Sequence, residues 1–322
     1  MRKILIGPAG HYHIGEKVLE KGADELYLGL KNWSLRSPCF EMTKSDITNL
    51  QSYAKKKNKV LRVCLNTYPW EHDLRSFDIE IEELVKIGIR AFVLADIANI
   101  KFIKRNYPGV SIQSSVACDT KNIDDVRVLE DAGATSVTLS LPNLNFVRLI
   151  KSTTDMDVVI FAHGYLNYTY RARCYMSSYL RHSYKVGSSG RENSSGSFNR
   201  EGFCNRACKC HWSLLSDSSF AENVTMNSYP FVTIDKLTAL LNAGADALKI
   251  QGRENSDNLV LDAVALYRTI LDSYLEAPTD FTVTDEMKQK ALHIDTLRHQ
   301  EMKGRTVVMI KEMLGIDKST TL

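Results

Sequence analysis

Four cysteines lie close together in the second half of the chain. They are Cys174, Cys204, Cys208 and Cys210, and His211 follows directly. Thiolates bind soft and borderline metal ions, so this density of thiols predicts a metal site, with zinc and an iron–sulfur cluster as the two candidates. The spacing leaves both open, because zinc sites usually combine two tight cysteine pairs and only one, C-x3-C, is present here.

Cys39 is a distant cysteine that would complete such a site. It lies in the loop after a predicted strand, and in a barrel this loop opens on the same face as the segment with the other four thiols. Its alternative role is that of a half-buried loop thiol, and Cys210 or His211 are alternative fourth ligands. Cys64 and Cys118 lie in or just after strands, where core or pocket-lining positions are typical. The odd total of seven cysteines argues against a disulfide framework.

Polar side chains end three of the predicted strands. Asn66 ends the third, His163 ends the seventh, and Lys249 and Arg253 flank the end of the eighth. Barrel enzymes often bind a phosphate or carboxylate at that last position, so Lys249 and Arg253 predict an anion-binding site, with a structural ion pair as the alternative. His163 is a candidate general acid or base, and its alternative is a hydrogen bond to a loop carbonyl.

A repeated pattern predicts the elements that position these residues. Amphipathic stretches end at Gly22, Gly88, Gly133 and Gly244, and an apolar, partly β-branched run begins two or three residues later. Glycine is the usual residue just after a helix because it adopts positive φ without a steric clash. Short apolar runs are typical of strands covered on both faces, as in a parallel sheet. The repeat therefore predicts helix, tight turn and buried strand.

Eight such strands indicate a (β/α)8 TIM-like barrel, with a doubly wound open sheet as the alternative. The predicted strands span residues 3–6, 25–28, 60–65, 91–95, 111–114, 136–139, 158–161 and 247–250. Helical patterns between them include residues 47–57, 79–87, 123–132 and 234–243. Two further helices are predicted at residues 258–275 and 285–314.

The predicted domain division follows from these elements. Residues 1–254 form the barrel, including a cysteine-containing insertion at 165–225 after the seventh strand, and residues 255–322 form C-terminal helices packed on it. Within the insertion, residues 186–202 are rich in Ser, Gly and Asn, which predicts a mobile loop or lid.

The composition is that of an ordinary globular protein, with 44% hydrophobic and 25% charged residues. The net charge of +3 is too small to indicate a nucleic-acid partner on its own, and such a partner is not expected. The sequence contains no apolar stretch of the length that a membrane-spanning helix needs, and its first residues do not resemble a signal peptide. These features predict a cytoplasmic protein.

Several segments, in order, resemble the peptidase U-32 family. They are PAG (8–10), GADELYLGL (22–30), Asn66, FAHGYLNYTYRARCYMSSYL (161–180), GFCNRACK (202–209), DALKIQGR (246–253) and VALYRTILDSY (264–274). The resemblance implies a barrel that carries a [4Fe-4S] cluster and takes part in oxygen-independent hydroxylation. Some members act as a UbiU/UbiV-type pair on a ubiquinone precursor, and longer ones modify tRNA or ribosomal RNA bases. The length of this chain resembles the short, small-molecule branch.

The sequence departs from the family pattern in ways that select the expected ligands. Asn167 stands where many members have a cysteine, and residues 229–233 lack another. The UbiV-type arrangement, one early cysteine and a later trio, is matched by Cys39, Cys174, Cys204 and Cys208. The family's KIEGR motif reads Lys-Ile-Gln-Gly-Arg here, so a carboxylate is lost at Gln251.

The leading hypothesis is an iron–sulfur hydroxylase that acts on a small aromatic or quinone-precursor-like molecule. Asn66 and His163 are the candidate catalytic residues, and Lys249 and Arg253 are the candidates for binding the substrate. One alternative is a non-catalytic, cluster-bearing partner of a paralogous subunit or electron donor, and another is RNA base hydroxylation. Peptidase activity is the least favoured, because the sequence has no HExxH motif and no Ser-His-Asp order.

Overall fold

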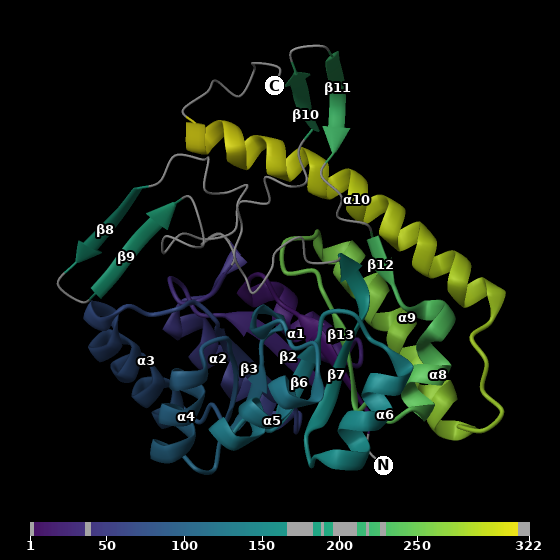
Figure 1. The fold of residues 1–322 in the computed structure, drawn as a ribbon, viewed down its shortest axis with the longest axis horizontal. Helices are drawn as coiled ribbons and strands as arrows, with labels where there is room; N and C mark the ends of the chain where they lie inside the picture. Colours follow the sequence, from purple (N-terminus) through teal and green to yellow (C-terminus); the bar gives the residue numbers. More distant parts are fainter. Residues whose placement is uncertain are drawn as a thin grey trace.

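The structure is a computed structural model whose backbone is described for residues 3–35, 40–165, 183–187, 190–195, 211–216, 219–225 and 230–314. Its central feature is a barrel of parallel strands (Figure 1). The barrel strands are β1 (Ile4–Pro8), β2 (Glu25–Gly29), β3 (Val60–Leu65), β4 (Ala91–Leu94), β5 (Ser111–Ser114), β6 (Ser136–Leu139), β7 (Asp157–Tyr165) and β13 (Ala247–Ile250).

The pairing of these strands closes the barrel. β1 pairs with β2 on one side and with β13 on the other, and β13 continues to β7. β7 also pairs with β6, which completes the circle through β5, β4 and β3. All eight pairings are parallel. The prediction of a closed (β/α)8 barrel is therefore confirmed, and the open doubly wound sheet is excluded.

Helices cover the outside of the barrel between successive strands. They are α1 (Tyr12–Glu20), α2 (Lys44–Lys56), α3 (Leu74–Lys86), α4 (Ile97–Asn106), α5 (Ile123–Ala132), α6 (Leu144–Thr153) and α8 (Leu237–Asn242). The repeated glycines have the expected role, because Gly22, Gly88, Gly133 and Gly244 all have positive φ angles between 96° and 114°. Side chains with a Cβ rarely adopt this conformation, so these glycines end the helices and start the turns into the strands.

The barrel wall separates two apolar cores. The outer core lies between strands and helices, and the inner core contains Ile6, Tyr27, Cys64, Val93, Val159 and Ala247. Below the inner core, Arg62 and Glu25 form a bidentate ion pair with N–O distances of 2.8 and 3.1 Å. Both side chains are buried, and the paired geometry satisfies charges that would be costly to bury alone.

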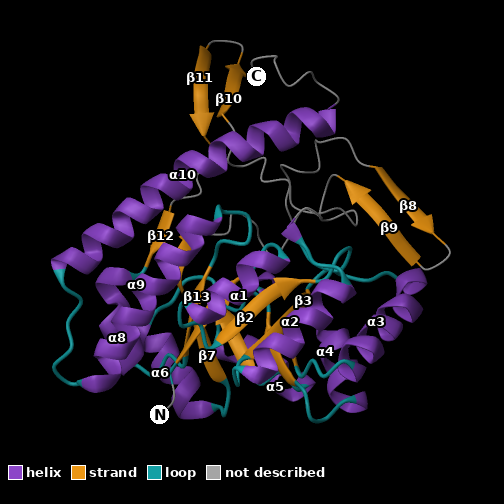
Figure 2. Cartoon of the chain, turned by 180° about the vertical axis from the view of Figure 1, so that it is seen from behind, coloured by secondary structure: helices purple, strands orange, loops and turns teal. Residues whose placement is uncertain are grey.

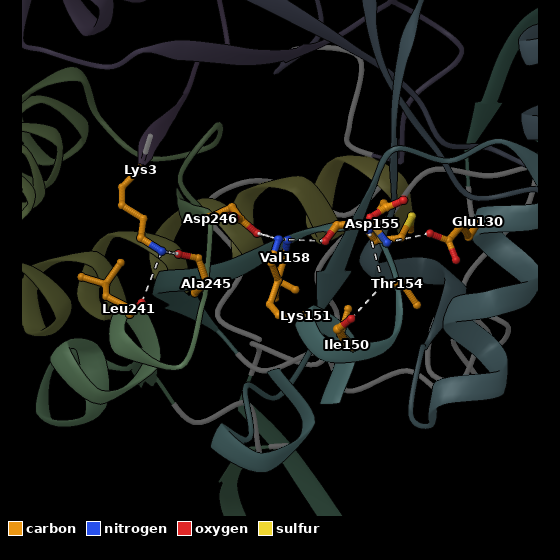
Figure 3. Close-up of polar contacts among 11 residues, drawn as sticks. Lys3, Glu130, Ile150, Lys151, Thr154, Asp155, Val158, Leu241, Ala245 and Asp246 are labelled. Carbon is orange, nitrogen blue, oxygen red and sulfur yellow. Dashed lines mark hydrogen bonds and ion pairs between the residues drawn. The ribbon is translucent and has the colours of Figure 1, made fainter. Parts of the chain in front are cut away.

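Polar contacts close the end of the barrel where the strands begin (Figure 3). The buried Lys3 donates from its Nζ to the carbonyls of Leu241, at 3.3 Å, and Ala245, at 2.7 Å. Asp246 accepts from the Val158 amide at 2.8 Å and from Lys151 Nζ at 2.9 Å. These bonds connect the starts of β1, β7 and β13, so they stabilise the junction where the barrel closes.

Two long helices follow the last strand, α9 (Asp257–Glu276) and α10 (Asp285–Leu314). α9 buries a full face against the barrel and α1, and α10 crosses above the barrel in both views (Figures 1 and 2). Arg298 of α10 is buried, and its Nη2 donates to the Gln251 carbonyl at 2.8 Å. Its Nε lies 3.3 Å from Asn255 Oδ1. α10 is therefore anchored directly to the segment that follows β13.

The insertion after β7 contains two described hairpins, β8–β9 and β10–β11. Their strands are β8 (Ser183–Gly187), β9 (Gly190–Ser195), β10 (His211–Ser216) and β11 (Ser219–Thr225). The prediction of a loop throughout residues 186–202 is wrong for residues 186–187 and 190–195, which pair as antiparallel strands. In this pairing Gly187 lies opposite Gly190. A serine- and glycine-rich composition indicates turns but does not exclude strand pairing.

The insertion returns to the barrel as β12 (Pro230–Val232). β12 pairs antiparallel with the end of β7, so that Pro230 lies opposite Tyr165 and Val232 opposite His163. Among the described residues, no helix is long and apolar enough to cross a membrane.

Candidate functional site

The loop after β2 is fixed at the barrel mouth, the end where the parallel strands have their carboxyl ends. Trp33 packs on Phe77 of α3 with ring centroids 5.2 Å apart, and the Trp33 carbonyl accepts a hydrogen bond of 3.3 Å from Thr67 Oγ1. The Leu35 amide donates to Asn66 Oδ1 at 3.3 Å. Because loops at this end of a barrel carry functional groups, the fixed loop is a platform for a site.

Arg253 reaches this loop from the segment after β13. Its Nη1 donates to Ser34 Oγ at 2.9 Å, and its guanidinium carbon lies 5.6 Å from the centroid of the Tyr27 ring. Two glycines make room for it. A Cβ at Gly29 would overlap Arg253 Nη1, and a Cβ at Gly10 would overlap the Arg253 carbonyl oxygen. The buried guanidinium is therefore held between close backbone segments.

Lys249 lies on the inner face of β13 and approaches the same aromatic ring. Its Nζ is 4.4 Å from the centroid of Tyr27 and 5.9 Å from that of Phe161. Burial lowers the pKa of Lys249 to about 8, and the positive charges of Arg62 and Arg253 act in the same direction. The structure thus brings the two predicted substrate-binding residues together on one ring, as two buried cations at the mouth.

Glu41 is a partly buried acid beside these cations that the sequence analysis missed. Its Oε2 accepts the Asn32 amide at 2.9 Å, and Asn32 has a φ of 71°, in the left-handed region. Its Oε1 is buried and has no hydrogen-bond partner among the described residues. Burial raises the pKa of Glu41 to about 7, although Arg253 and the bonds from Asn32 and Ser34 favour the charged form. A carboxyl group with this pKa exchanges protons near neutrality.

Asn66 connects two loops at the mouth. Its Oδ1 accepts from Leu35, and its Nδ2 donates to Ser115 Oγ at 3.3 Å, after β5. Asn66 and Arg253 therefore bind successive residues of the loop after β2, Leu35 and Ser34. This geometry gives Asn66 a positioning contact, and its assignment to catalysis stays a prediction.

His163 lies away from Lys249 and Arg253, on the outer side of the barrel wall. A register shift between β7 and β13 sets it opposite Ile250, a residue of the outer core. Regular alternation from Phe161 would have directed His163 inward, so the irregularity in β7 decides its direction. Its ring is buried and packs edge-on against Tyr267 of α9, with centroids 5.7 Å apart.

The hydrogen bonds of His163 define its protonation. The Tyr267 hydroxyl donates to the Ala162 carbonyl at 2.9 Å and lies 3.2 Å from His163 Nδ1, so Nδ1 is the donor in that second bond. Nε2 lies 3.6 Å from Asp295 Oδ1 of α10. Burial holds the pKa of His163 well below its usual value, and the charge of Arg298 lowers it further. His163 is thus a neutral contact between β7, α9 and α10, and its catalytic role stays a prediction.

The predicted cluster ligands Cys39, Cys174, Cys204 and Cys208 lie outside the described residues, as does Cys210. The described flanks of the first of these, Leu35 and Glu41, are both fixed at the mouth. Within the described part of the chain, no group of three or more His, Cys, Asp or Glu side chains is close enough to hold a metal ion. Cys64 lies in the inner core, and Cys118 donates to the Ala95 carbonyl at 3.3 Å.

Three residues of the site were not singled out from sequence, namely Tyr27, Ser34 and Glu41. Tyr27 belongs to an apolar run that reads as a buried strand, and nothing in it distinguishes an aromatic ring that faces two cations. Glu41 and Ser34 are single polar residues in a loop, where such residues are common. Tyr27, Ser34 and Glu41 form one site only because the fold places Arg253, after β13, beside β2 and the loop that follows it.

Comparison with known proteins identifies the family. A family model described as "Peptidase family U32" matches residues 10–303. The chain belongs to the peptidase U32 family. A solved U32 structure, described as the U32 peptidase Mk0906, matches with a TM-score of 0.51 and 8% identity, covering 80% of this chain and 95% of that one. At this identity the likeness shows the fold alone.

Relatives within the U32 family carry names that refer to RNA hydroxylation. The "23S rRNA 5-hydroxycytidine C2501 synthase" of Escherichia coli is 25% identical over 97% of this chain and 46% of its own length. The "tRNA hydroxylation protein P1" of Bacillus subtilis is 24% identical over 88% of this chain and 66% of its own. A "Collagenase" of Porphyromonas gingivalis is 22% identical over 86% of this chain. The U32 chain described here thus spans between about half and two thirds of the length of the first two.

Proposed function

We propose that this U32 protein takes part in a hydroxylation reaction, with an RNA nucleobase as the first candidate acceptor. The observation that carries the proposal is the pair of buried cations, Lys249 and Arg253, that faces one aromatic ring at the barrel mouth. A phosphate or another anionic group is the natural ligand of such a pair. The names of the matched relatives supply the reaction type.

The acceptor is the point at which the proposal departs from the expectation drawn from sequence. The small net charge favoured a small molecule, whereas two matched relatives are named for ribosomal and transfer RNA. The net charge sums over the whole chain, and two buried cations that bind one phosphate contribute little to it. A small anionic aromatic molecule is the second candidate, because Lys249 and Arg253 are both almost fully buried and fit a small group best.

We also propose that Cys39, Cys174, Cys204 and Cys208 hold a [4Fe-4S] cluster, with zinc as the alternative. Four thiols are the usual ligand set of such a cluster. The described contacts support a place at the mouth, because Asn66 fixes one flank of Cys39 and Asn32 fixes the other. When bound, a cluster supplies electron transfer, and in this proposal hydroxylation does not depend on molecular oxygen.

The remaining roles follow from the contacts of the chain's own residues. Arg253 and Lys249 bind the anionic group of the substrate and orient it over Tyr27. The carboxyl group of Glu41, whose pKa burial raises to about 7, is the group that takes up or releases a proton near neutrality. Asn66 keeps the loop that carries Ser34 in place. In this scheme His163 is a positioning residue that fixes α9 and α10 against β7.

Complementation tests the proposal. The chain is expressed in E. coli that lacks the 23S rRNA 5-hydroxycytidine C2501 synthase, and separately in E. coli that lacks another relative of this chain, the tRNA hydroxylation protein P. Mass spectrometry of digested RNA then measures the hydroxylated nucleosides, in cells grown with and without oxygen. We expect one of the two modifications to return in both conditions with the wild-type chain and to fall at least tenfold with Arg253→Met.

The control is Lys121→Met, which removes an exposed cation and should restore the modification as well as the wild-type chain does. If both RNAs remain unmodified while the chain accumulates normally, an RNA acceptor is contradicted. Restoration only in the presence of oxygen contradicts the oxygen-independent mechanism.

A further inference from the structure

The barrel holds two buried lysines whose surroundings differ sharply. Lys3, at the start of β1, donates hydrogen bonds to two backbone carbonyls, those of Leu241 and Ala245 (Figure 3). Lys249, at the end of β13, makes no hydrogen bond or ion pair with any described residue, and its Nζ faces the rings of Tyr27 and Phe161. Lys3 is therefore bound by backbone carbonyls of the fold, whereas the contacts of the Lys249 amine among the described residues are with aromatic rings.

Burial favours loss of the Lys249 proton and is the largest of the effects that lower its pKa to about 8. The guanidinium groups of Arg62 and Arg253 act in the same direction, whereas Cys64 and Glu25 raise the pKa. Roughly a tenth of the chains then carry a neutral amine at pH 7, and about half do so at pH 8. A neutral amine in an apolar site next to other cations is the usual form of a nucleophilic lysine.

Arg253 lies on the same aromatic ring and adds a second recognition element. Among the described residues its guanidinium makes one hydrogen bond, from Nη1 to Ser34 Oγ. The planar arrangement of the guanidinium N–H groups suits a carboxylate. An amine and a guanidinium that share the Tyr27 ring would bind two different groups of one small molecule.

We propose that Lys249 forms an imine with a small carbonyl compound that also carries a carboxylate, which Arg253 binds. The Lys249 nitrogen forms a bond to the carbonyl carbon, and the carbonyl oxygen takes two protons from the former ammonium group and leaves as water. The protonated amine and the carbonyl compound thus give a protonated imine and one water molecule, with no oxidant or reductant. The imine withdraws electrons from the adjacent carbon of the ligand and so activates it.

This inference goes beyond the proposed hydroxylation and does not depend on it. Imine formation requires the barrel, Lys249 and Arg253, and it involves neither the cysteines nor RNA. A trapping experiment therefore remains informative whichever acceptor is hydroxylated.

Reductive trapping with pyruvate tests the inference. The full-length protein is incubated with pyruvate and sodium cyanoborohydride at pH 7 and pH 8, and peptide mass spectrometry locates the reduced adduct on individual lysines. We expect modification of Lys249 at least tenfold above the mean of the exposed lysines, and faster modification at pH 8. Lys3→Met, the matched buried-lysine variant, should leave the adduct in place, and Lys249→Arg should abolish it while keeping the positive charge.

Two further arms examine the role of Arg253. Acetone offers a carbonyl group without a carboxylate and should modify Lys249 at least tenfold more slowly than pyruvate in the wild-type protein. With Arg253→Met that preference should disappear. A circular-dichroism spectrum of each variant shows whether it is folded, and Lys249→Met serves as a second variant if Lys249→Arg does not fold.

Several outcomes would overturn the inference. Adducts spread over exposed lysines with none on Lys249 exclude a nucleophilic Lys249. If pyruvate and inorganic phosphate stabilise the protein equally against urea unfolding and no adduct forms, Lys249 and Arg253 bind anions without forming an imine. If the wild-type protein restores RNA hydroxylation but forms no trapped adduct, only the imine is contradicted. If it forms the adduct but restores no hydroxylation, only the proposed function is contradicted.

Discussion

Arg253 Nη1 and Ser34 Oγ lie 2.9 Å apart, although 219 residues separate them in the chain. The contact joins the segment after the last barrel strand to the loop after the second. β1 stands between β13 and β2 in the barrel, so Arg253 must reach across it to make this bond. The reach is possible because Gly29, at the end of β2, has no side chain to occupy the space.

Replacing Gly29 with alanine should break the hydrogen bond between Arg253 and Ser34. The added Cβ would overlap Arg253 Nη1 and Ser34 Oγ, and relief by a shifted side chain or backbone typically costs about 1–3 kcal/mol. We expect Gly29→Ala to lower the stability by that amount and to weaken the binding of phosphate at least tenfold, measured by urea unfolding and calorimetry. Gly109→Ala is the matched control, because a Cβ there meets nothing within 4 Å and should change the stability by less than about 0.5 kcal/mol.

Glu41 should make the fold less stable as the pH rises. Its pKa is about 7 in the folded chain and 4.5 as the ordinary value, so between these values the folded chain binds a proton that the unfolded chain does not. The stability contributed by this proton is complete below pH 4.5 and is lost as the pH rises to 7, by at most about 1.4 kcal/mol per pH unit. Glu41→Gln should gain stability relative to the wild type between pH 5 and pH 7.5, as measured by urea unfolding.

The control for Glu41 is Glu82→Gln, which alters an exposed carboxylate. Its stability should equal that of the wild type within about 0.5 kcal/mol at pH 5 and at pH 7.5. An unchanged difference between Glu41→Gln and the wild type across this range would contradict a raised pKa at Glu41.

His163 should have the opposite effect on stability, so that the fold becomes less stable as the pH falls. Its pKa in the folded chain lies well below the ordinary 6.5, so the unfolded chain binds a proton that the folded chain does not. The stability is therefore complete above pH 6.5 and falls as the pH decreases below it, by at most about 1.4 kcal/mol per pH unit. His163→Phe keeps a ring but cannot be protonated, so its stability should fall less than that of the wild type between pH 7 and pH 5.

The variant Tyr267→Phe distinguishes the effect of His163 protonation from the effect of losing contacts around the ring. It removes the hydroxyl that bonds Ala162 and His163 while His163 remains, so the stability should decrease by about 1–3 kcal/mol at both pH values with its pH dependence preserved. If His163→Phe has the same pH dependence as the wild type, the histidine is not buried in its neutral form.

The cysteine assignment predicts a loss of metal on single substitution. Protein purified without oxygen should contain about four irons and four sulfides per chain with visible absorbance. Cys39→Ala and Cys174→Ala should each reduce the iron content by more than half. Cys118→Ala is the control, because its thiol already donates to the Ala95 carbonyl, and it should leave the iron content unchanged. Stoichiometric zinc without visible absorbance would contradict the cluster.

The barrel could be predicted from sequence because its signals are local. Four of the helices are followed by a glycine with positive φ, and the strands are short apolar runs, so strands such as β3 (60–65) and β6 (136–139) were predicted at their observed bounds. The same holds for α10, which was predicted at 285–314. Such signals depend only on neighbouring residues and on the 3.6-residue and 2-residue periods of helix and strand.

The site could be predicted only in part because its contacts are not local. Lys249 and Arg253 were found because their position at a strand end is visible in sequence. Glu41 was missed because its raised pKa results from burial beneath the mouth, and His163 was expected there because nothing in sequence reveals the register shift in β7. Burial and strand irregularities depend on the whole fold, so they become visible only in three dimensions.

The pairing of β12 with the end of β7 has a consequence for how this family could diversify. Residues 163–165 and 230–232 lie side by side, so everything between them departs from and returns to nearly one point on the barrel. The entropy of closing such a loop grows slowly, by about 0.6 kcal/mol for each doubling of length. The segment can therefore be lengthened, shortened or exchanged between relatives as a cassette while the barrel beneath it continues to fold.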